Sequence, residues 1–362
     1  MLAGEANRQP DKEGGENKVE KKEFGRIKDG SMAYLYTLRN KNGMCAAVTD
    51  FGAALVSLWV PNEKGEKIDV VLGYDDAAGY EAGEAALGAC VGRNANRIGG
   101  AVFELNGITY KLEDNDNGNN LHSGSQYYHK RIWTVEEVKD DRIVFLLRSP
   151  DNDQGYPGSL AMRASYMLGE ENTLRLTYEA VPDKDTIINM TNHSYFNLNG
   201  HGSGSIVNHF MKIDADYYTK ADAKSIPTGE IAEVEGTPMD FRDGQQIREG
   251  IDADYEAIKF GGGYDHNWVL KNNGKFAKVA EAAGDKSGIR MEVWTDMPGM
   301  QVYTANFLDH EPGKGGLHYQ RRWAVCFETQ YFPDAIHHEH FPGPVCRAGK
   351  TYKTDTEYRF SL

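Results

Sequence analysis

Residues 173–180 read TLRLTYEA, and apolar and polar side chains alternate along this segment. Residues 289–295, IRMEVWT, repeat the same two-residue period. Such alternation is typical of a strand with one face in a core and the other toward solvent. Further short runs with strand character cover residues 33–38, 44–49, 54–60, 69–72, 143–148 and 162–167. The chain is therefore predicted to consist mainly of strands.

Turn signals separate these runs. The 40 glycines include Asn-Gly pairs at 106–107, 199–200 and 273–274, which suit tight hairpins. Many short strands at hairpin spacing predict an all-β fold, a large antiparallel β-sandwich or barrel. Helical periodicity is scarce: residues 76–82 and 240–245 are predicted as short helices, each opened by an aspartate that caps it.

Composition limits the domain organisation and the partners. Residues 1–24 are rich in Glu, Lys, Gly and Asn and are predicted to be a flexible tail, while 25–362 are predicted to form one domain. A net charge of −14 argues against nucleic acid as a partner. No apolar run is long enough to cross a membrane.

The four cysteines are widely spaced and are expected to be free and buried, which fits a reducing compartment. A cytoplasmic location is expected. A periplasmic or exported form stays open if a signal preceded residue 1.

The chemistry is expected to centre on residues 189–200, NMTNHSYFNLNG. His193 is surrounded there by amides, hydroxyls and aromatic rings, with no charged neighbour. A side chain that titrates near neutral pH in such company suits proton transfer to a polar, uncharged ligand such as a sugar. A structural histidine in a turn is the alternative.

Four more polar clusters could contribute: GRNANR (92–97), NNLHSG (119–124), GYDHNW (263–268) and AVCFETQYFP (324–333). Arginine and asparagine match sugar hydroxyls and ring oxygens. Strand alternation sends Asp265 and His266 to opposite faces. Glu328 ends an apolar strand, so partial burial would raise its pKa and improve it as a base. Surface turns and a solvent-facing glutamate are the alternatives.

Metal and cofactor sites are not expected. His337, His338 and His340 form the densest histidine cluster, but no third ligand stands at a recognisable spacing, and the segment is interpreted as a loop. Phosphate loops, nucleophile elbows and dinucleotide fingerprints are absent from the sequence.

Taken in order, GRNANRI, NNLHSG, NMTNHSYFNLNG, TPMDFR, GYDHNWVL, PGMQVYTANF and ETQYFPDA closely resemble the aldose 1-epimerase family, the galactose mutarotases. The resemblance runs from about Gly25 to the C-terminus. It implies a large β-sandwich that interconverts the α and β anomers of free hexoses such as galactose and glucose, without cofactor or metal.

The resemblance also implies roles for individual residues. His193 would donate a proton to the ring oxygen, and Glu328 would accept the anomeric proton. The implied sugar-binding residues are Asn96, Arg97, His122, Ser194, Tyr195, Asp265 and Gln301. Met239 and Met300 depart from the family pattern and are expected to shape sugar preference.

Two other functions compete with this one. A non-catalytic carbohydrate-binding module would need hydroxyl partners but no acid and base. A glycoside hydrolase would use Asp265 and Glu328 as its two carboxylates. The expected partner is a small aldose, and the expected oligomeric state is a monomer or weak homodimer.

Overall fold

The computed structural model describes residues 19–362, and it confirms the strands predicted from the two alternating segments. Strand β14 (Thr173–Pro182) and strand β24 (Arg290–Thr295) both bury every second residue. They lie on either side of β30 (Tyr352–Ser361), which pairs with both. The two segments are thus neighbours of one central strand.

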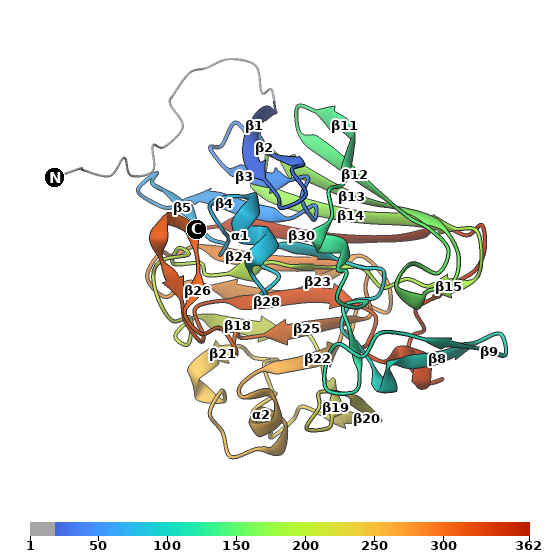
Figure 1. Cartoon of the computed structure of the whole chain (residues 1–362). Coiled ribbons are helices and arrows are strands. Elements are labelled where there is room, and N and C mark those ends of the chain that lie inside the picture. The colour runs from blue at the N-terminus through green and yellow to red at the C-terminus, as the bar shows by residue number, and fades with distance from the viewer. Residues whose placement is uncertain (1–18) are drawn as a thin grey trace.

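These strands belong to a nine-stranded sheet that crosses the molecule (Figure 1), in the order β11, β12, β13, β14, β30, β24, β23, β18, β21. Its other members are β11 (Thr134–Lys139), β12 (Arg142–Ser149), β13 (Leu160–Gly169), β18 (Phe210–Ile213), β21 (Gln245–Gln246) and β23 (Ala277–Ala283). The long hairpins β12–β13–β14 pair in a regular, unbroken register.

A six-stranded sheet carries the residues that matter for function. Its order is β17 (Tyr195–Phe196), β28 (Val325–Gln330), β25 (Gly299–Tyr303), β22 (Asp265–Val269), β19 (Tyr217–Ala221) and β20 (Pro227–Glu233). All these neighbours pair antiparallel.

A third sheet contains the N-terminal strands β1 (Glu20–Arg26), β2 (Met32–Arg39), β3 (Cys45–Thr49), β4 (Leu55–Pro61) and β5 (Lys67–Asp69). Five short ladders complete the strands: β6 (Ala89–Val91) with β16 (Thr191–His193), β7 (Arg97–Ile98) with β10 (Asn120–Leu121), β8 (Val102–Leu105) with β9 (Ile108–Lys111), β15 (Thr186–Ile187) with β29 (Val345–Cys346), and β26 (Glu311–Pro312) with β27 (His318–Tyr319). The expected all-β antiparallel sandwich is confirmed.

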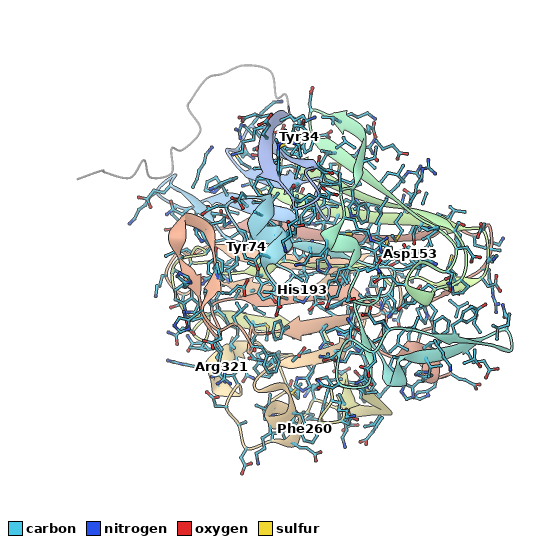
Figure 2. The ribbon with its side chains drawn as sticks, in the orientation of Figure 1. Tyr34, Tyr74, Asp153, His193, Phe260 and Arg321 are labelled. Carbon is cyan, nitrogen blue, oxygen red and sulfur yellow. The ribbon has the colours of Figure 1, made fainter. Side chains whose placement is uncertain are left out.

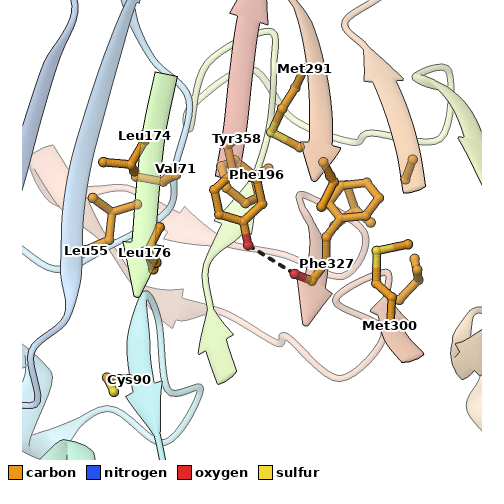
Figure 3. Packing of buried hydrophobic residues seen from close by; sticks show 14 of the residues in the cluster. Leu55, Val71, Cys90, Leu174, Leu176, Phe196, Met291, Met300, Phe327 and Tyr358 are labelled. Atoms are coloured by element: carbon orange, nitrogen blue, oxygen red, sulfur yellow. Dashed lines mark hydrogen bonds between the residues drawn. The ribbon is translucent and has the colours of Figure 1, made fainter. Parts of the chain in front are cut away.

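The core lies between the sheets. Leu174 and Met291 of the nine-stranded sheet share one buried cluster with Phe327 and Met300 of the six-stranded sheet (Figure 3). The Tyr358 hydroxyl donates to the Phe327 carbonyl at 3.1 Å, which joins β30 to β28. This packing fixes which face of β28 is left for the site.

The helices only partly match the prediction. Helix α1 (Ala77–Ala82) begins where expected, and the Asp76 side chain accepts from the Gly79 amide as its cap. The helix predicted over residues 240–245 is wrong. There the Asp240 carboxylate accepts from the Arg242 amide and Gly244 has a positive φ of 78°, so the segment turns back into β21. The second helix is α2 (Glu256–Gly261).

The predicted tail, residues 1–24, extends too far toward the C-terminus. Residues 1–18 lie outside the described residues, but residues 20–24 belong to β1, which pairs with β2. Phe24 is buried against the N-terminal sheet, and this apolar contact offsets the polar character of the segment around it. The ordered chain therefore begins before residue 25.

Candidate active site

The site lies on the face of the six-stranded sheet that points away from the core. In β28, Val325 and Phe327 pack into the core, so Cys326 and Glu328 point the other way. Gln301 of β25 stands directly opposite Glu328, and Asn267 of β22 stands opposite Gln301. A row of polar side chains thus crosses this face of the sheet, and Glu328 forms the floor of the site.

His193 reaches this floor from a neighbouring segment. It ends β16, which pairs with β6, and its carbonyl accepts from the Gly88 amide at 2.9 Å. Its ring lies over Tyr195 with centroids 5.0 Å apart and planes at 23°. Figure 2 shows His193 near the middle of the molecule. Both the backbone and the ring are therefore held in place.

His193 and Glu328 meet at the base of a cavity of about 460 Å³. The Nε2 atom of His193 lies 3.6 Å from Oε1 of Glu328, and the two residues are 7% and 2% exposed. Glu328 Oε2 is buried without a hydrogen-bond partner among the described residues. An imidazole and a carboxylate thus share one opening toward a ligand.

Burial changes the acidity of both groups. It lowers the pKa of His193 to about 4, because the charged imidazolium loses hydration. It raises the pKa of Glu328 well above its usual value, and the negative charge of Asp265 raises it further. Burial alone favours the uncharged pair, whereas their mutual attraction favours the ion pair. Burial and mutual attraction therefore act in opposite directions on the proton that the pair shares.

Residues that can hold hydroxyl groups surround this pair. Asn96 and His122 bind each other: the Asn96 amide donates to His122 Nδ1 at 3.2 Å, and the His122 amide donates to the Asn96 carbonyl at 3.1 Å. Because Nδ1 is an acceptor and burial lowers the pKa of His122, the ring is neutral with its proton on Nε2. It presents an uncharged donor to the site.

Charged groups complete the wall. Arg97 lines the cavity while its Nε donates to Asp116 at 2.6 Å. The Asp265 carboxylate also lines the cavity and accepts from Gln301 Nε2 at 2.7 Å. The anchored arginine offers donors and the aspartate offers acceptors at fixed positions.

Most of the residues expected at the site come together there. The cavity is lined by His193, Glu328, Asn96, Arg97, His122, Tyr195 and Asp265. Gln301 lies behind Asp265 rather than on the lining. Ser194 also lies off the lining, because it points opposite to its neighbours His193 and Tyr195 along an extended segment.

Several expectations from the sequence need correction. Met239 and Met300 are fully buried in the core, so neither touches the cavity. Arg93 is also fully buried and donates to the carbonyls of Pro157 and Gly158. These three residues hold the fold rather than a ligand.

The cavity also has lining residues that the sequence did not suggest, among them Glu84, Tyr127, His129, Tyr303, Phe307 and Glu311. Tyr303 follows Gln301 by two residues, so strand alternation would have found it. Tyr127 and His129 stack on each other at 4.6 Å and come from a loop with no recognisable signal.

Histidine clusters elsewhere do not form a metal site. Within residues 19–362 no group of three or more His, Cys, Asp or Glu side chains is arranged to hold a metal ion. His338 and His340 instead contact the carbonyls of Pro227 and Gly229. The same residues contain no helix long and apolar enough to cross a membrane.

Comparison with known proteins assigns the family. Residues 34–359 match the family model described as aldose 1-epimerase. The chain belongs to the aldose 1-epimerase family. It is 38% identical over 316 residues to the galactose mutarotase of Bos taurus, covering 87% of this chain and 90% of that protein. It is 37% identical over 337 residues to the aldose 1-epimerase of Escherichia coli (strain K12), covering 92% and 96%.

Solved structures show the same aldose 1-epimerase architecture. An aldose epimerase homologue from C. elegans superposes with a TM-score of 0.85 at 32% identity, covering 91% of this chain and 99% of the other. A galactose 1-epimerase from Lactobacillus acidophilus gives 0.84 at 28% identity, covering 95% and 98%.

Proposed function

We propose that this protein is an isomerase that interconverts the α and β anomers of free aldoses such as galactose and glucose. The observation that carries the proposal is the buried pair of His193 and Glu328, with Nε2 and Oε1 3.6 Å apart at the base of a cavity. Anomer exchange requires one acid and one base within reach of the same sugar. This pair supplies both.

The reaction needs two proton transfers. Ring opening removes the proton from the anomeric hydroxyl and adds one to the ring oxygen, which leaves an open-chain aldehyde. Glu328 as the carboxylate takes the first proton, while His193 as the imidazolium gives the second from Nε2. The aldehyde then rotates about its bond to the next carbon. When the ring closes on the other carbonyl face, both protons return.

The two states of the pair match the two stages of this cycle. The ion pair is the form that opens the ring, and the neutral pair is the form present with the aldehyde. Burial disfavours the ion pair and mutual attraction favours it. The same two groups exchange roles when the ring closes, so the cycle runs in both directions.

Hydroxyl recognition is assigned to the groups around the pair. Asn96, Arg97 and His122 donate to sugar oxygens from one wall, and Asp265 accepts from sugar hydroxyls on the other. Gln301 holds Asp265 in position through its 2.7 Å hydrogen bond. Tyr195 supports the His193 ring by stacking.

We further propose one domain from about residue 20 to 362, a monomer or weak homodimer, and a cytoplasmic location. The four cysteines are all free, which supports a reducing compartment. The buried cluster shared by the two large sheets supports a single domain.

Polarimetry on freshly dissolved α-galactose or α-glucose tests the activity. We expect the protein to accelerate the approach to anomeric equilibrium, and His193→Asn and Glu328→Gln each to remove most of that acceleration. Sugar binding without acceleration would favour a carbohydrate-binding module instead. Release of sugar from a glycoside would favour a hydrolase.

A further inference from the structure

The two nitrogens of the His193 ring face two side chains of one strand. Glu328 and Cys326 are two residues apart in β28 and therefore lie on the same face. Glu328 Oε1 lies 3.6 Å from Nε2, and Cys326 Sγ lies 3.5 Å from Nδ1. The thiol is fully buried and belongs to the apolar cluster beneath the cavity.

We propose that Cys326 is a positioning residue that accepts a hydrogen bond from Nδ1–H of His193 and holds the neutral ring in that tautomer. The lone pair of the neutral ring then lies on Nε2, which becomes the one nitrogen that exchanges a proton with the sugar. This inference rests on the proposed anomer exchange, and it adds Cys326 to the site as the residue that holds the far side of the His193 ring.

The direction of the hydrogen bond follows from the chemistry of the cycle. After His193 gives its Nε2 proton to the ring oxygen, Nε2 must take a proton back when the ring closes. A neutral ring can do so only if its remaining proton is on Nδ1. A thiol that donated to Nδ1 would place that proton on Nε2 and block the return step. The contact therefore works with sulfur as the acceptor.

A neutral acceptor has a specific advantage here. Burial raises the pKa of the Cys326 thiol well above its usual value, and the charges of Glu328 and Asp265 raise it further, so the group stays uncharged. A carboxylate at this position would stabilise the imidazolium and hold its proton. A thiol orients the ring and leaves the proton free to move. The rings of Tyr195, His122 and Tyr303 also lie beside His193. As uncharged rings they do not hold the His193 proton in place.

Nitrogen NMR on the full chain, labelled with ¹⁵N-histidine, reads the tautomer directly, and His193→Asn identifies the signals of His193. We expect the neutral His193 ring of the wild type to carry its proton on Nδ1. Cys326→Ala removes the acceptor, so the Nε2–H form should grow and kcat should fall about tenfold with KM unchanged, the lower end of the loss seen when the partner that orients a metal-bound histidine is removed. Cys326→Ser keeps an acceptor and should restore the tautomer and most of kcat.

Cys45→Ala is the matched control, because Cys45 is a buried thiol of β3 in the N-terminal sheet, where its sulfur contacts Gly43 and Lys67. It should leave both the tautomer and kcat unchanged. Thermal unfolding of all variants separates folding defects from effects on the ring.

A wild-type His193 ring with its proton on Nε2 would overturn the proposal. So would a Cys326→Ala variant that loses stability and kcat while its His193 spectrum stays the same, since that pattern describes packing alone. The tautomer is measured without turnover. A wild type that does not accelerate mutarotation would therefore refute the proposed function, and the spectra would still decide the role of Cys326.

Discussion

Two histidines of this protein are buried beside a carboxylate, but they differ in what their nitrogens face. His193 Nε2 lies 3.6 Å from Glu328, and His209 Nδ1 lies 3.3 Å from Asp285. Burial lowers the pKa of both rings to about 4. A shifted pKa and a nearby carboxylate therefore do not distinguish a proton-transfer site from a structural one.

The difference lies in how the second nitrogen is used. His209 Nε2 accepts from the Leu198 amide at 3.0 Å, its Nδ1 faces Asp285, and the ring is fully enclosed, so neither nitrogen can meet a ligand. His193 lines a cavity, and its Nε2 and Glu328 open toward a ligand. A histidine ring can exchange a proton with a ligand only if one of its nitrogens is accessible to that ligand. Access and hydrogen-bond commitment, rather than acidity, separate the two sites.

The largest expected difference is in turnover. His193→Asn should lower kcat for mutarotation by about 10² to 10⁴-fold, the usual contribution of a positioned acid or base. His209→Asn should leave kcat per folded molecule within about twofold, because its ring never meets the sugar. Polarimetry at saturating sugar compares the two variants. Equal losses in both would show that the ring in the cavity is no more important for turnover than the enclosed ring.

Stability should show the opposite order. His209→Asn takes the acceptor from the buried Leu198 amide, which should cost about 1–3 kcal/mol in the free energy of unfolding. His193→Asn should cost less, because the asparagine amide can be solvated through the cavity. Urea unfolding of both variants at neutral pH measures the difference. A His193→Asn variant that is the less stable of the two would contradict this order.

Acid should weaken the fold through both His209 and His193. The unfolded chain binds a proton at each histidine near pH 6.5, whereas both folded rings stay neutral down to about pH 4. The unfolded state thus binds more protons in this range, so stability is lost as pH falls from 6.5 toward 4.

At the His193 site the loss of stability in acid is opposed by Glu328. Its raised pKa makes the folded state take up a proton as pH falls. His209→Asn and His193→Asn should each flatten the loss of stability with acid, because each removes one buried histidine with a pKa of about 4. Glu328→Gln removes the opposing contribution and should make the loss steeper. Urea midpoints at several pH values between 4 and 7 check this, and an unchanged slope in Glu328→Gln would show that Glu328 gives no such compensation.

The smallest effect is expected at the second carboxylate. Asp285 has a side chain that is 22% exposed, and it also accepts from Asn199 at 2.9 Å. Asp285→Asn should cost no more than about 1 kcal/mol, as is usual for partly solvated pairs, and should not change kcat. Glu328→Gln makes the matching change at the first site and should remove most activity.

The sequence predicted the strands better than the helices. The alternation in 173–180 and 289–295 appears in β14 and β24 because one face of each strand is buried. The predicted helix at 240–245 fails because Asp240 uses its side chain to form a turn instead of a cap. Helix α2 has no side-chain N-cap, so the sequence carries no capping signal for it.

Site residues were predictable where a recognisable motif carried them, and unpredictable where only the fold brings them in. Asp265, Glu328 and His193 stand in such motifs. Strand pairing brings Asp265 and Glu328 to one face through β25, and the pairing of Tyr195 with Cys326 places His193 beside them. Tyr127 and His129 reach the cavity from a distant loop, and their positions depend on long-range packing. The burial that shifts the pKa of His193 is likewise a property of the folded molecule.

Strand β30 has a consequence for how the molecule is made. Residues 352–361 lie between β14 and β24 and therefore join the two halves of the nine-stranded sheet. During synthesis the ribosome releases these residues after the other strands of residues 19–362 have emerged, so the two halves of the sheet have unpaired edges until then. The hydrogen bond from Tyr358 to Phe327 joins β30 to the strand that forms the floor of the active site. This floor is then among the last parts of a new molecule to form.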